Sequence, residues 1–210
     1  CAEAGFLDQI QRAGMQCAGI ELEKARVDLA LEKNPQLNLY VGDITDADFT
    51  GKIGKFDLIV VREVIEHVPD RQKMFVNMKN MLNPGGYIYV TFPPRFSPFA
   101  GHQQNGRTFL RYLPFLHYLP AAGLEWLGRM AGEPDYHMQN IIRNYREGLS
   151  VSRFQHHVRS FSFTIVVWDL FFIRPVYSYR YGLKPLRLPD IPLLREILTL
   201  GCETILQKKQ

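Results

Sequence analysis

FDLIVVREVIEHVPDRQKMFVNMKNMLNPGGYIYVTFPP, residues 56–94, carries the clearest structural signal in this chain. It opens with a short apolar run rich in β-branched residues, which is typical of a buried strand in a parallel sheet. Met74, Met78 and Met81 then recur at helical spacing. Residues 83–86, Asn-Pro-Gly-Gly, end that helix because proline cannot continue it and glycine accepts a left-handed turn. With a second apolar run at 87–92, the order predicts a βαβ unit with a right-handed crossover.

Strands and helices alternate on both sides of this unit. The pattern predicts an α/β fold with a doubly wound, mostly parallel seven-stranded sheet, Rossmann-like in kind, with inserted lid segments. A loop at residues 1–5 opens the sequence with no strand before it, so we expect the first strand to be absent from this record. The expected helices are 6–12, 24–31 and 150–158, and the further strands 16–21, 37–41, 164–173 and 202–207.

A chain of 210 residues predicts one domain, 1–210. Its first half, 1–94, has the regular pattern. Residues 95–148 are rich in proline and aromatic side chains, which is typical of an inserted lid over a substrate. A C-terminal helix and strands follow in 149–210, with a second insertion at 174–200.

The composition excludes several classes of protein. A hydrophobic content of 46% argues against disorder, and a net charge of +4 is small for a nucleic-acid-binding surface. The basic cluster at 153–159 is therefore expected to be a solvated helix face. Three widely spaced cysteines suit a reducing compartment, so we expect a cytoplasmic protein, and no segment is apolar enough to span a membrane. The sequence leaves the oligomeric state open.

Acidic residues follow successive predicted strands. In open α/β sheets ligands bind beyond the carboxyl ends of the strands, and an acidic residue at the second strand end accepts hydrogen bonds from ribose hydroxyls. Glu21 occupies that place, and Asp43 follows the next strand. The small residues of the loop at 1–5 let backbone N–H groups approach a ligand at a helix N-terminus. The pattern predicts a nucleoside site.

With these residues in view, the chain resembles the class I S-adenosylmethionine-dependent methyltransferases, closest to the group with ubiquinone- and menaquinone-pathway enzymes. The resemblance covers roughly residues 1–94, and its segments are CAEAGFL, GIEL, GDI, FDLIVVREVIEHV and LNPGGYIYVTFPP. Residues 150–172 and CETILQK also match the family's last helix and closing strands.

The resemblance implies S-adenosylmethionine as cofactor, with S-adenosylhomocysteine as product. Residues 2–5 would lie against its methionine part, and Val61 with Arg62 would line the side near the sulfonium. Glu21 would hold the ribose, Leu22 and Ile44 would flank the adenine, and Asp43 would bind the adenine amino group. The implied cofactor-binding residues are Ala2, Glu3, Ala4, Gly5, Glu21, Leu22, Asp43, Ile44, Val61 and Arg62.

The chain departs from the family pattern in its first loop. Ala2 and Ala4 stand where the family has the last two glycines, and Gly5 comes one place later. Because alanine disfavours positive φ, we expect a slightly different loop shape. The acids assigned to the cofactor could also have purely structural roles. Glu21 could be an ordinary strand-end carboxylate and Asp43 a turn residue. A structural salt bridge is an equally good explanation of Arg62.

The turn after residue 61 carries the sequence Arg-Glu-Val-Ile-Glu-His. At helical spacing Glu63, Glu66 and His67 could share one face and bind a divalent cation, as in relatives that have a magnesium-type site. Many relatives keep this motif for packing and helix capping alone, which is the alternative reading. His102 is the candidate catalytic residue, as a general base, and it could also be a fourth ligand or a lid hydrogen-bond partner.

We therefore expect an S-adenosylmethionine-dependent methyltransferase acting on a small, apolar or aromatic acceptor. Its partners would be a small-molecule substrate and no nucleic acid. One alternative is a catalytically inactive, cofactor-binding partner subunit, which the altered glycines make conceivable. Another is an NAD-dependent oxidoreductase, against which the missing GxGxxG motif argues.

Overall fold

The computed structural model describes residues 4–209. They form two compact units. Within the described residues, the N-terminal unit comprises 4–55 and Gln72–Met81, and the sheet unit comprises Phe56–Arg71 and 82–209. Each unit is described by itself, and the organisation as a single domain stays a prediction.

The N-terminal unit contains two short parallel strands, with Glu21 opposite Val41 in their register. Its small core includes Ala4, Ala30 and Leu37. The Asp46 carboxylate accepts hydrogen bonds from two backbone N–H groups of the helix that it caps. The elements of this unit are α1 (Gly5–Arg12), β1 (Gly19–Glu21), α2 (Lys24–Lys33), β2 (Leu39–Val41), α3 (Ala47–Thr50) and all but the first residue of α4 (Arg71–Met81).

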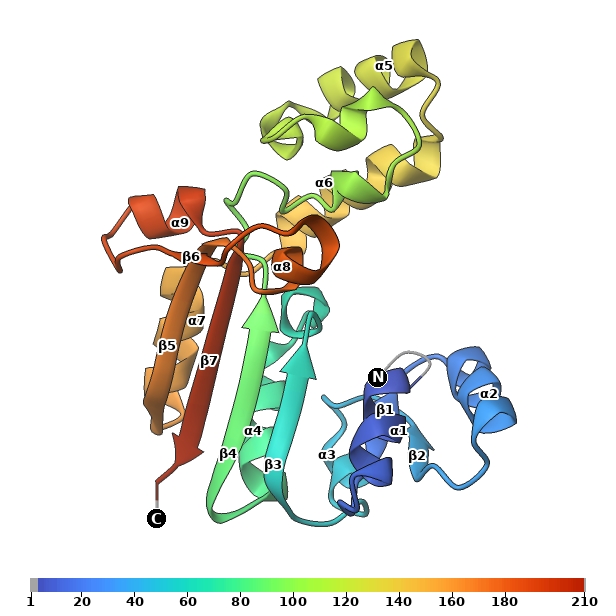
Figure 1. The fold of residues 1–210 in the computed structure, drawn as a ribbon, viewed down its shortest axis with the longest axis vertical. Helices are drawn as coiled ribbons and strands as arrows, with labels where there is room; N and C mark the ends of the chain where they lie inside the picture. Colours follow the sequence, from blue (N-terminus) through green and yellow to red (C-terminus); the bar gives the residue numbers. More distant parts are fainter. Residues whose placement is uncertain (1–3, 210) are drawn as a thin grey trace. The chain divides into compact units, whose positions relative to one another are not determined.

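The sheet unit contains a five-stranded sheet in the order β3-β4-β7-β5-β6 (Figure 1). Strands β3 and β4 are parallel, and each of the other neighbouring pairs is antiparallel. The sheet core includes Ile88, Val90 and Phe92, all fully buried. The strands are β3 (Phe56–Arg62), β4 (Leu82–Phe92), β5 (Phe163–Ile173), β6 (Leu186–Arg187) and β7 (Gly201–Lys208).

This topology confirms the α/β class and corrects the predicted sheet. The described residues form a two-stranded and a five-stranded sheet instead of one sheet of seven strands. The larger sheet is also mixed instead of mostly parallel, because the last strand, β7, inserts between β4 and β5 and runs against both. A strand added from the far end of the chain leaves no trace in the local hydrophobic pattern that predicted the parallel pairs.

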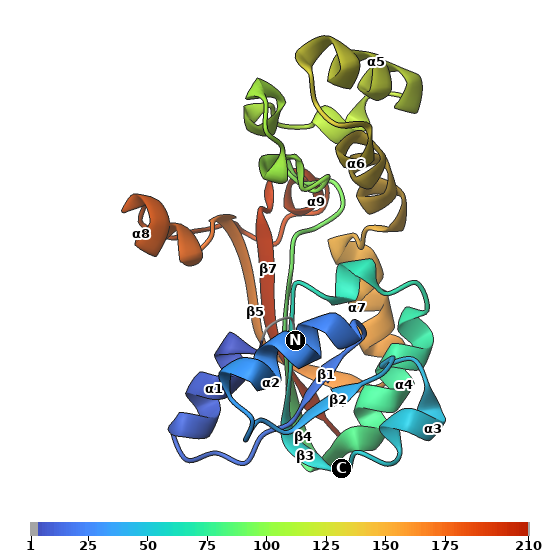
Figure 2. The same ribbon diagram turned by 90° about the vertical axis from the view of Figure 1, so that its right-hand side faces the viewer.

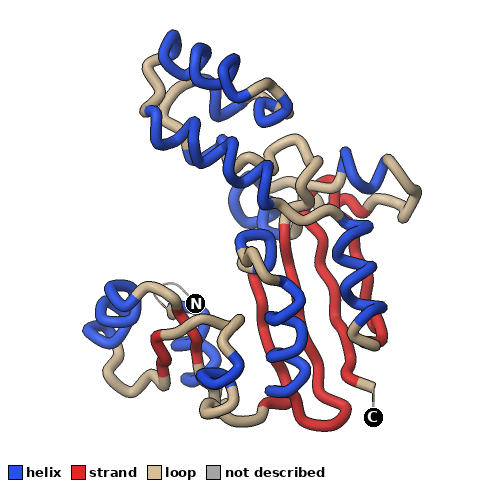
Figure 3. The backbone as a smooth tube through the Cα atoms, turned by 180° about the vertical axis from the view of Figure 1, so that it is seen from behind, coloured by secondary structure: helices blue, strands red, loops and turns tan. Residues whose placement is uncertain are grey.

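Helix α7 (Val151–Ser160) lies along one face of this sheet (Figure 3). Ser150 caps it, because its hydroxyl accepts a hydrogen bond from the Arg153 N–H at 3.2 Å. Fully buried Phe154 anchors the helix, with its ring centroid 5.0 Å from that of Phe92 in β4. The expected helix and the strand that follows it are both confirmed.

The Pro-Gly-Gly break after α4 ends the helix as predicted, but the strand begins earlier than expected. The register of β3 and β4 shifts between Phe56 and Leu58, which pair with Leu82 and Tyr87. The break is thus a bulge within β4, and Gly85 supplies the positive φ of 74° that it needs.

Residues 95–148, predicted as a lid, are largely helical. Their last two helices, α5 (Ala121–Ala131) and α6 (Asp135–Glu147), pack side by side (Figure 2). Gly128 allows this close approach, because a Cβ there would lie 2.4 Å from Cγ of Met138. Three short 3-10 helices precede them: η2 (Gln103–Asn105), η3 (Phe109–Tyr112) and η4 (Leu116–Tyr118).

The second insertion, 174–200, contains α8 (Val176–Tyr181), β6 and α9 (Leu194–Leu198). Its Glu196 carboxylate accepts hydrogen bonds from the N–H groups of Val151 and Ser152, at 2.9 and 2.7 Å. A carboxylate at this place also complements the positive end of the α7 dipole. The insertion is therefore tied to the start of α7.

Within residues 4–209 the structure shows no helix with the length and apolarity needed to cross a membrane. The described cysteines, Cys17 and Cys202, are both free thiols.

Candidate functional site

The two predicted nucleoside-binding acids stand at neighbouring strand ends. Glu21 is the last residue of β1, and Asp43 comes two residues after β2. The strands are parallel, and the Gly42 N–H donates a hydrogen bond to the Glu21 carbonyl oxygen at 3.0 Å. The N-terminal unit thus places two carboxylates at the same edge of its small sheet.

Local backbone bonds orient both carboxylates. Oε1 of Glu21 accepts hydrogen bonds from the N–H groups of Leu22 and Glu23, at 3.0 and 3.3 Å. Oδ1 of Asp43 accepts one from the Thr45 N–H at 2.8 Å. Each carboxylate thus accepts backbone hydrogen bonds in its own turn, as the alternative interpretations of Glu21 and Asp43 predicted. Such a role fixes the carboxylate in place and leaves room for a ligand bond, because a carboxylate has about four lone-pair positions.

The apolar partners assigned to the adenine also lie in this unit. Leu22 is 67% exposed. The Ile44 carbonyl oxygen accepts a hydrogen bond from Nδ2 of buried Asn77 at 2.8 Å, which holds the turn after Asp43 in place. The sequence analysis missed Asn77, whose only signal was a polar residue beside Met78 and Phe75 on the buried face of α4.

The first loop has the conformation that alanine was expected to avoid. Ala4 adopts φ 54° at the N-cap of α1 and is 2% exposed. Its methyl group belongs to the core cluster with Ala30 and Leu37, and such burial offsets a left-handed cost of about 1–2 kcal/mol. Gly5 begins the helix. The predicted contacts of Ala2 and Glu3 lie outside the described residues.

Val61 and Arg62 belong to the sheet unit, where they end β3 opposite Val90 and Thr91. Val61 is buried and Arg62 is exposed. Their assignment to the cofactor stays a prediction.

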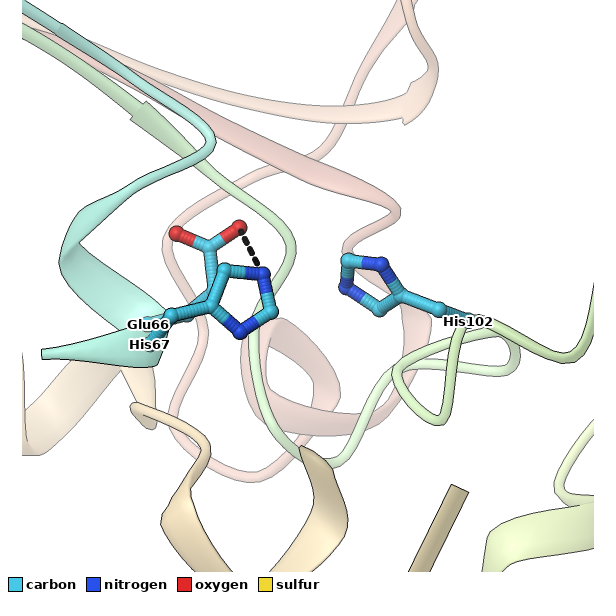
Figure 4. Close-up of side chains that lie close together, drawn as sticks. All are labelled: Glu66, His67 and His102. Carbon is cyan, nitrogen blue, oxygen red and sulfur yellow. Dashed lines mark ion pairs between the residues drawn. The ribbon is translucent and has the colours of Figure 1, made fainter. Parts of the chain in front are cut away.

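The turn after β3 and the start of the 95–148 segment bring three ligand-type side chains together (Figure 4). Glu66 and His67 lie in the 3-10 helix η1 (Ile65–His67), and His102 reaches toward them from the other side. Each offers a ligand atom within 4.8 Å of the others. The two imidazole rings meet edge to face with centroids 5.2 Å apart. The sequence had named all three without showing that His102 would join the pair.

Burial controls the charge of this cluster. Burial, with a smaller contribution from the Glu63 carboxylate, raises the pKa of Glu66 to about 8. Burial likewise lowers the pKa of His102 to about 4, and it lowers the pKa of His67. Among the described residues neither carboxylate oxygen of Glu66 has a hydrogen-bond partner. The cluster is therefore neutral near pH 7, and its buried carboxyl group lacks a hydrogen-bond partner among the described residues.

Glu63, the third predicted metal ligand, is held by a different partner. Its Oε1 lies 2.5 Å from Nη2 of Arg174, the residue that follows β5. The Thr91 hydroxyl lies 3.3 Å from the same oxygen. The structure thus groups Glu66 and His67 with His102, and Glu63 with Arg174.

The sequence analysis also missed the residue that holds η1 in place. Buried Arg71 donates from Nε to the Ile65 carbonyl oxygen at 2.9 Å and from Nη2 to that of Glu66 at 2.8 Å. Nη2 also donates to the carbonyl oxygen of Glu147 at the end of α6. An arginine in the first turn of a helix is normally expected on the surface, so nothing in the sequence indicated that Arg71 would be buried.

A cavity of about 310 Å³ adjoins the cluster within the sheet unit. It combines the Glu63–Arg174 ion pair and the two imidazoles with both polar and apolar side chains. Its lining residues are Glu63, His67, Pro93, Ser97, Phe99, His102, Gln104, Asn105, Arg174, Tyr177 and Leu200. A pocket of this kind suits a small molecule with an apolar body and a polar group.

Comparisons with known proteins agree on one family. Residues 1–90 match the family model described as "Methyltransferase domain". Similar curated proteins include the ubiquinone biosynthesis O-methyltransferases of Coxiella burnetii, 26% identical over 93 residues, and of Escherichia fergusonii, 23% identical over 148 residues. These alignments cover 43% and 68% of this chain, and 40% and 54% of the relatives. The chain thus spans about half the length of the curated relatives it matches.

Solved structures show the same fold at low sequence identity. A methyltransferase from Mesorhizobium loti is 11% identical, with a TM-score of 0.60 over 99% of this chain and 87% of the other. The plantazolicin methyltransferase BpumL, solved in complex with SAH, is 14% identical, with a TM-score of 0.60 over 100% of this chain and 74% of the other. Residues 1–90 are thus similar to the methyltransferase domain family, and the fold of the chain is similar to that of solved S-adenosylmethionine-dependent methyltransferases.

Proposed function

We propose that this protein transfers a methyl group from S-adenosylmethionine to a small, apolar or aromatic acceptor. The observation that carries this proposal is the pair of carboxylates at the ends of β1 and β2, Glu21 and Asp43. Two neighbouring acids suit a nucleoside, one for the ribose hydroxyls and one for the adenine amino group. Exposed Leu22 supplies an apolar surface for the base.

Isothermal titration with S-adenosylhomocysteine tests this assignment without needing the acceptor. Glu21→Gln and Asp43→Asn should each weaken binding by about tenfold, since each removes a charge-assisted hydrogen bond. Glu23→Gln is the matched control, because it changes an acid two residues from Glu21 that pairs with Arg26 on the surface. Unchanged affinity in both site variants, or no binding by the protein, would contradict the proposal.

The acceptor would occupy the cavity of the sheet unit. Methyl transfer is an in-line displacement, so positioning supplies much of the rate, and an acceptor hydroxyl must also lose its proton. His102 lines this cavity in its neutral form. Its lowered pKa makes it a weak base near pH 7, where an effective general base has a pKa close to the working pH. Release of radiolabelled methyl groups to an acceptor would distinguish an active enzyme from an inactive partner subunit.

We further propose that Glu66, His67 and His102 hold a divalent metal ion. The donor set fits a metal, because neutral imidazoles and a carboxyl group that releases its proton on metal binding are ordinary ligands, and the Glu66 oxygens have no hydrogen-bond partner among the described residues. A bound metal would supply Lewis acidity toward an acceptor oxygen. Binding of Co²⁺ that Glu66→Gln and His102→Ala each abolish would support the site. Binding that survives both changes would exclude it.

We also propose a cytoplasmic location, which the free thiols of Cys17 and Cys202 support. A fluorescent fusion followed in cell fractions would test it. Recovery outside the cytoplasmic fraction would contradict it.

A further inference from the structure

Arg174 engages Glu63 with both arms of its guanidinium group. Nη2 lies 2.5 Å from Oε1 of Glu63, and Nη1 lies 3.4 Å from Oε2. Bidentate pairing of this kind is stronger and more specific than a single charge-assisted bond. Both carboxylate oxygens of Glu63 therefore contact Arg174, and Oε1 also accepts a hydrogen bond from the Thr91 hydroxyl at 3.3 Å.

The position of Arg174 is built into the sheet. It follows β5 directly, and its side chain crosses the start of β7 at Gly201. A Cβ at Gly201 would lie 2.6 Å from Nε and 2.8 Å from Cδ of Arg174, so only glycine leaves room for this path. Arg174 is thus packed in place and not a mobile surface side chain.

Glu63 is held just as firmly and faces the cluster. It adopts a φ of 52°, which is rare for a residue other than glycine, and its N–H donates to the Thr91 carbonyl oxygen at 2.9 Å. It lines the same cavity as His67 and His102. Its charge acts on Glu66, His67 and His102 alike. Glu63 therefore lies beside the cluster but outside the group of three ligand atoms, and its oxygens bind a guanidinium.

We propose that the ion pair with Arg174 keeps the Glu63 carboxylate from binding the metal. The metal ligands are then limited to one carboxylate and two imidazoles. This inference rests on the metal site proposed above. A set of two nitrogen donors and one oxygen suits Zn²⁺, Co²⁺ or Fe²⁺ better than Mg²⁺, which prefers oxygen ligands. Without Arg174, Glu63 would be free to bind the metal as a further ligand. The metal site would then prefer metals that bind oxygen ligands.

Titration of the protein with Co²⁺ measures both affinity and ligand set, because the visible bands of Co²⁺ respond to coordination. Arg174→Gln should tighten Co²⁺ binding by about tenfold or more and change the visible spectrum. The double variant Arg174→Gln/Glu63→Gln removes the freed carboxylate as well. It should return the spectrum to that of the unchanged protein.

A matched control separates ligand recruitment from simple loss of positive charge. Arg143 of α6 also acts electrostatically on His67 but does not contact Glu63 in any hydrogen bond or ion pair of the described residues. Arg143→Gln should therefore raise the affinity slightly and leave the spectrum unchanged. If Arg174→Gln behaves no differently from Arg143→Gln, the inference is wrong.

If Arg174→Gln fails to fold, the variant Glu63→Gln tests the same inference. If Arg174 keeps Glu63 from the metal, Glu63→Gln should leave the Co²⁺ spectrum unchanged. The variant should bind Co²⁺ more weakly, because the positive charge of Arg174 is then unbalanced. A changed spectrum would show that Glu63 is already a ligand and would overturn the inference. Absence of Co²⁺ binding in the unchanged protein would instead refute the metal site itself.

Discussion

Oε1 of Glu66 lies 3.8 Å from Nε2 of His67, too far for a hydrogen bond, and the carboxyl group is 4% exposed. A buried carboxyl group without a hydrogen-bond partner is costly to ionise. The arrangement therefore links the stability of this protein to pH.

Glu66→Gln should remove a pH-dependent loss of stability. The pKa of Glu66 rises from 4.5 to about 8 on folding, so the folded state favours the protonated form. Its contribution is fully present below pH 4.5 and is lost as the pH rises toward 8. At pH 8 the variant should gain about 2–4 kcal/mol relative to the unchanged protein. Urea unfolding from pH 4.5 to 8.5 in the presence of a chelator measures this. Exposed Glu32→Gln is the control, and a Glu66→Gln effect that is equal at every pH would contradict the assignment.

Arg71→Met should destabilise the turn that carries Glu66 and His67. It removes the donors to the carbonyl oxygens of Ile65, Glu66 and Glu147, which then lack these bonds in a buried site. We expect a loss of about 2–4 kcal/mol in unfolding free energy by urea titration. Arg129→Met on the exposed face of α5 should change stability by less than about 0.5 kcal/mol. Equal losses in the two variants would show that the three carbonyl contacts contribute nothing.

His117→Phe should make the protein less sensitive to acid. His117 is 1% exposed, and among the described residues neither ring nitrogen has a hydrogen-bond partner. Burial lowers its pKa from 6.5 to about 4, so its contribution is present above pH 6.5 and is lost as the pH falls toward 4. Phenylalanine should fill the same aromatic site beside Tyr118 and Tyr145 without that loss. Thermal unfolding at pH 7 and pH 4.5 measures the difference, with exposed His156→Phe as the control. A variant as acid-sensitive as the unchanged protein would rule out His117 as the cause.

Gly128→Ala and Gly123→Ala should act in opposite directions although both lie in α5. A Cβ at Gly128 would collide with the Met138 side chain at 2.4 Å, whereas a Cβ at Gly123 has no neighbour within 4 Å. Alanine at Gly123 should therefore stabilise by about 0.5–1 kcal/mol through helix propensity. Alanine at Gly128 should destabilise by about 1–3 kcal/mol through overpacking between α5 and α6. Thermal unfolding of the pair decides the point, and a gain at Gly128 would mean that Met138 can move aside.

Local patterns were sufficient to predict most of the elements. Helix α7 and strand β5 follow from spacing and side-chain type, because these depend on neighbours within a few residues. The placement of Glu21 beside Asp43 also follows from sequence, since consecutive parallel strands present their carboxyl ends at one edge. Ala4 is the exception among local features, because its burial against Ala30 overrides the usual avoidance of positive φ.

The sequence by itself determined the α/β class, the resemblance to methyltransferases over residues 1–90, and the two neighbouring acids at the ends of β1 and β2. Only the tertiary structure decided three features: the mixture of parallel and antiparallel strands in the larger sheet, the proximity of His102 to Glu66, and the ion pair between Glu63 and Arg174. The physical reason is the distance along the chain over which each feature forms. Periodicity and turn chemistry act over a few residues, whereas β7 and Arg174 reach β4 and Glu63 by packing more than a hundred residues away.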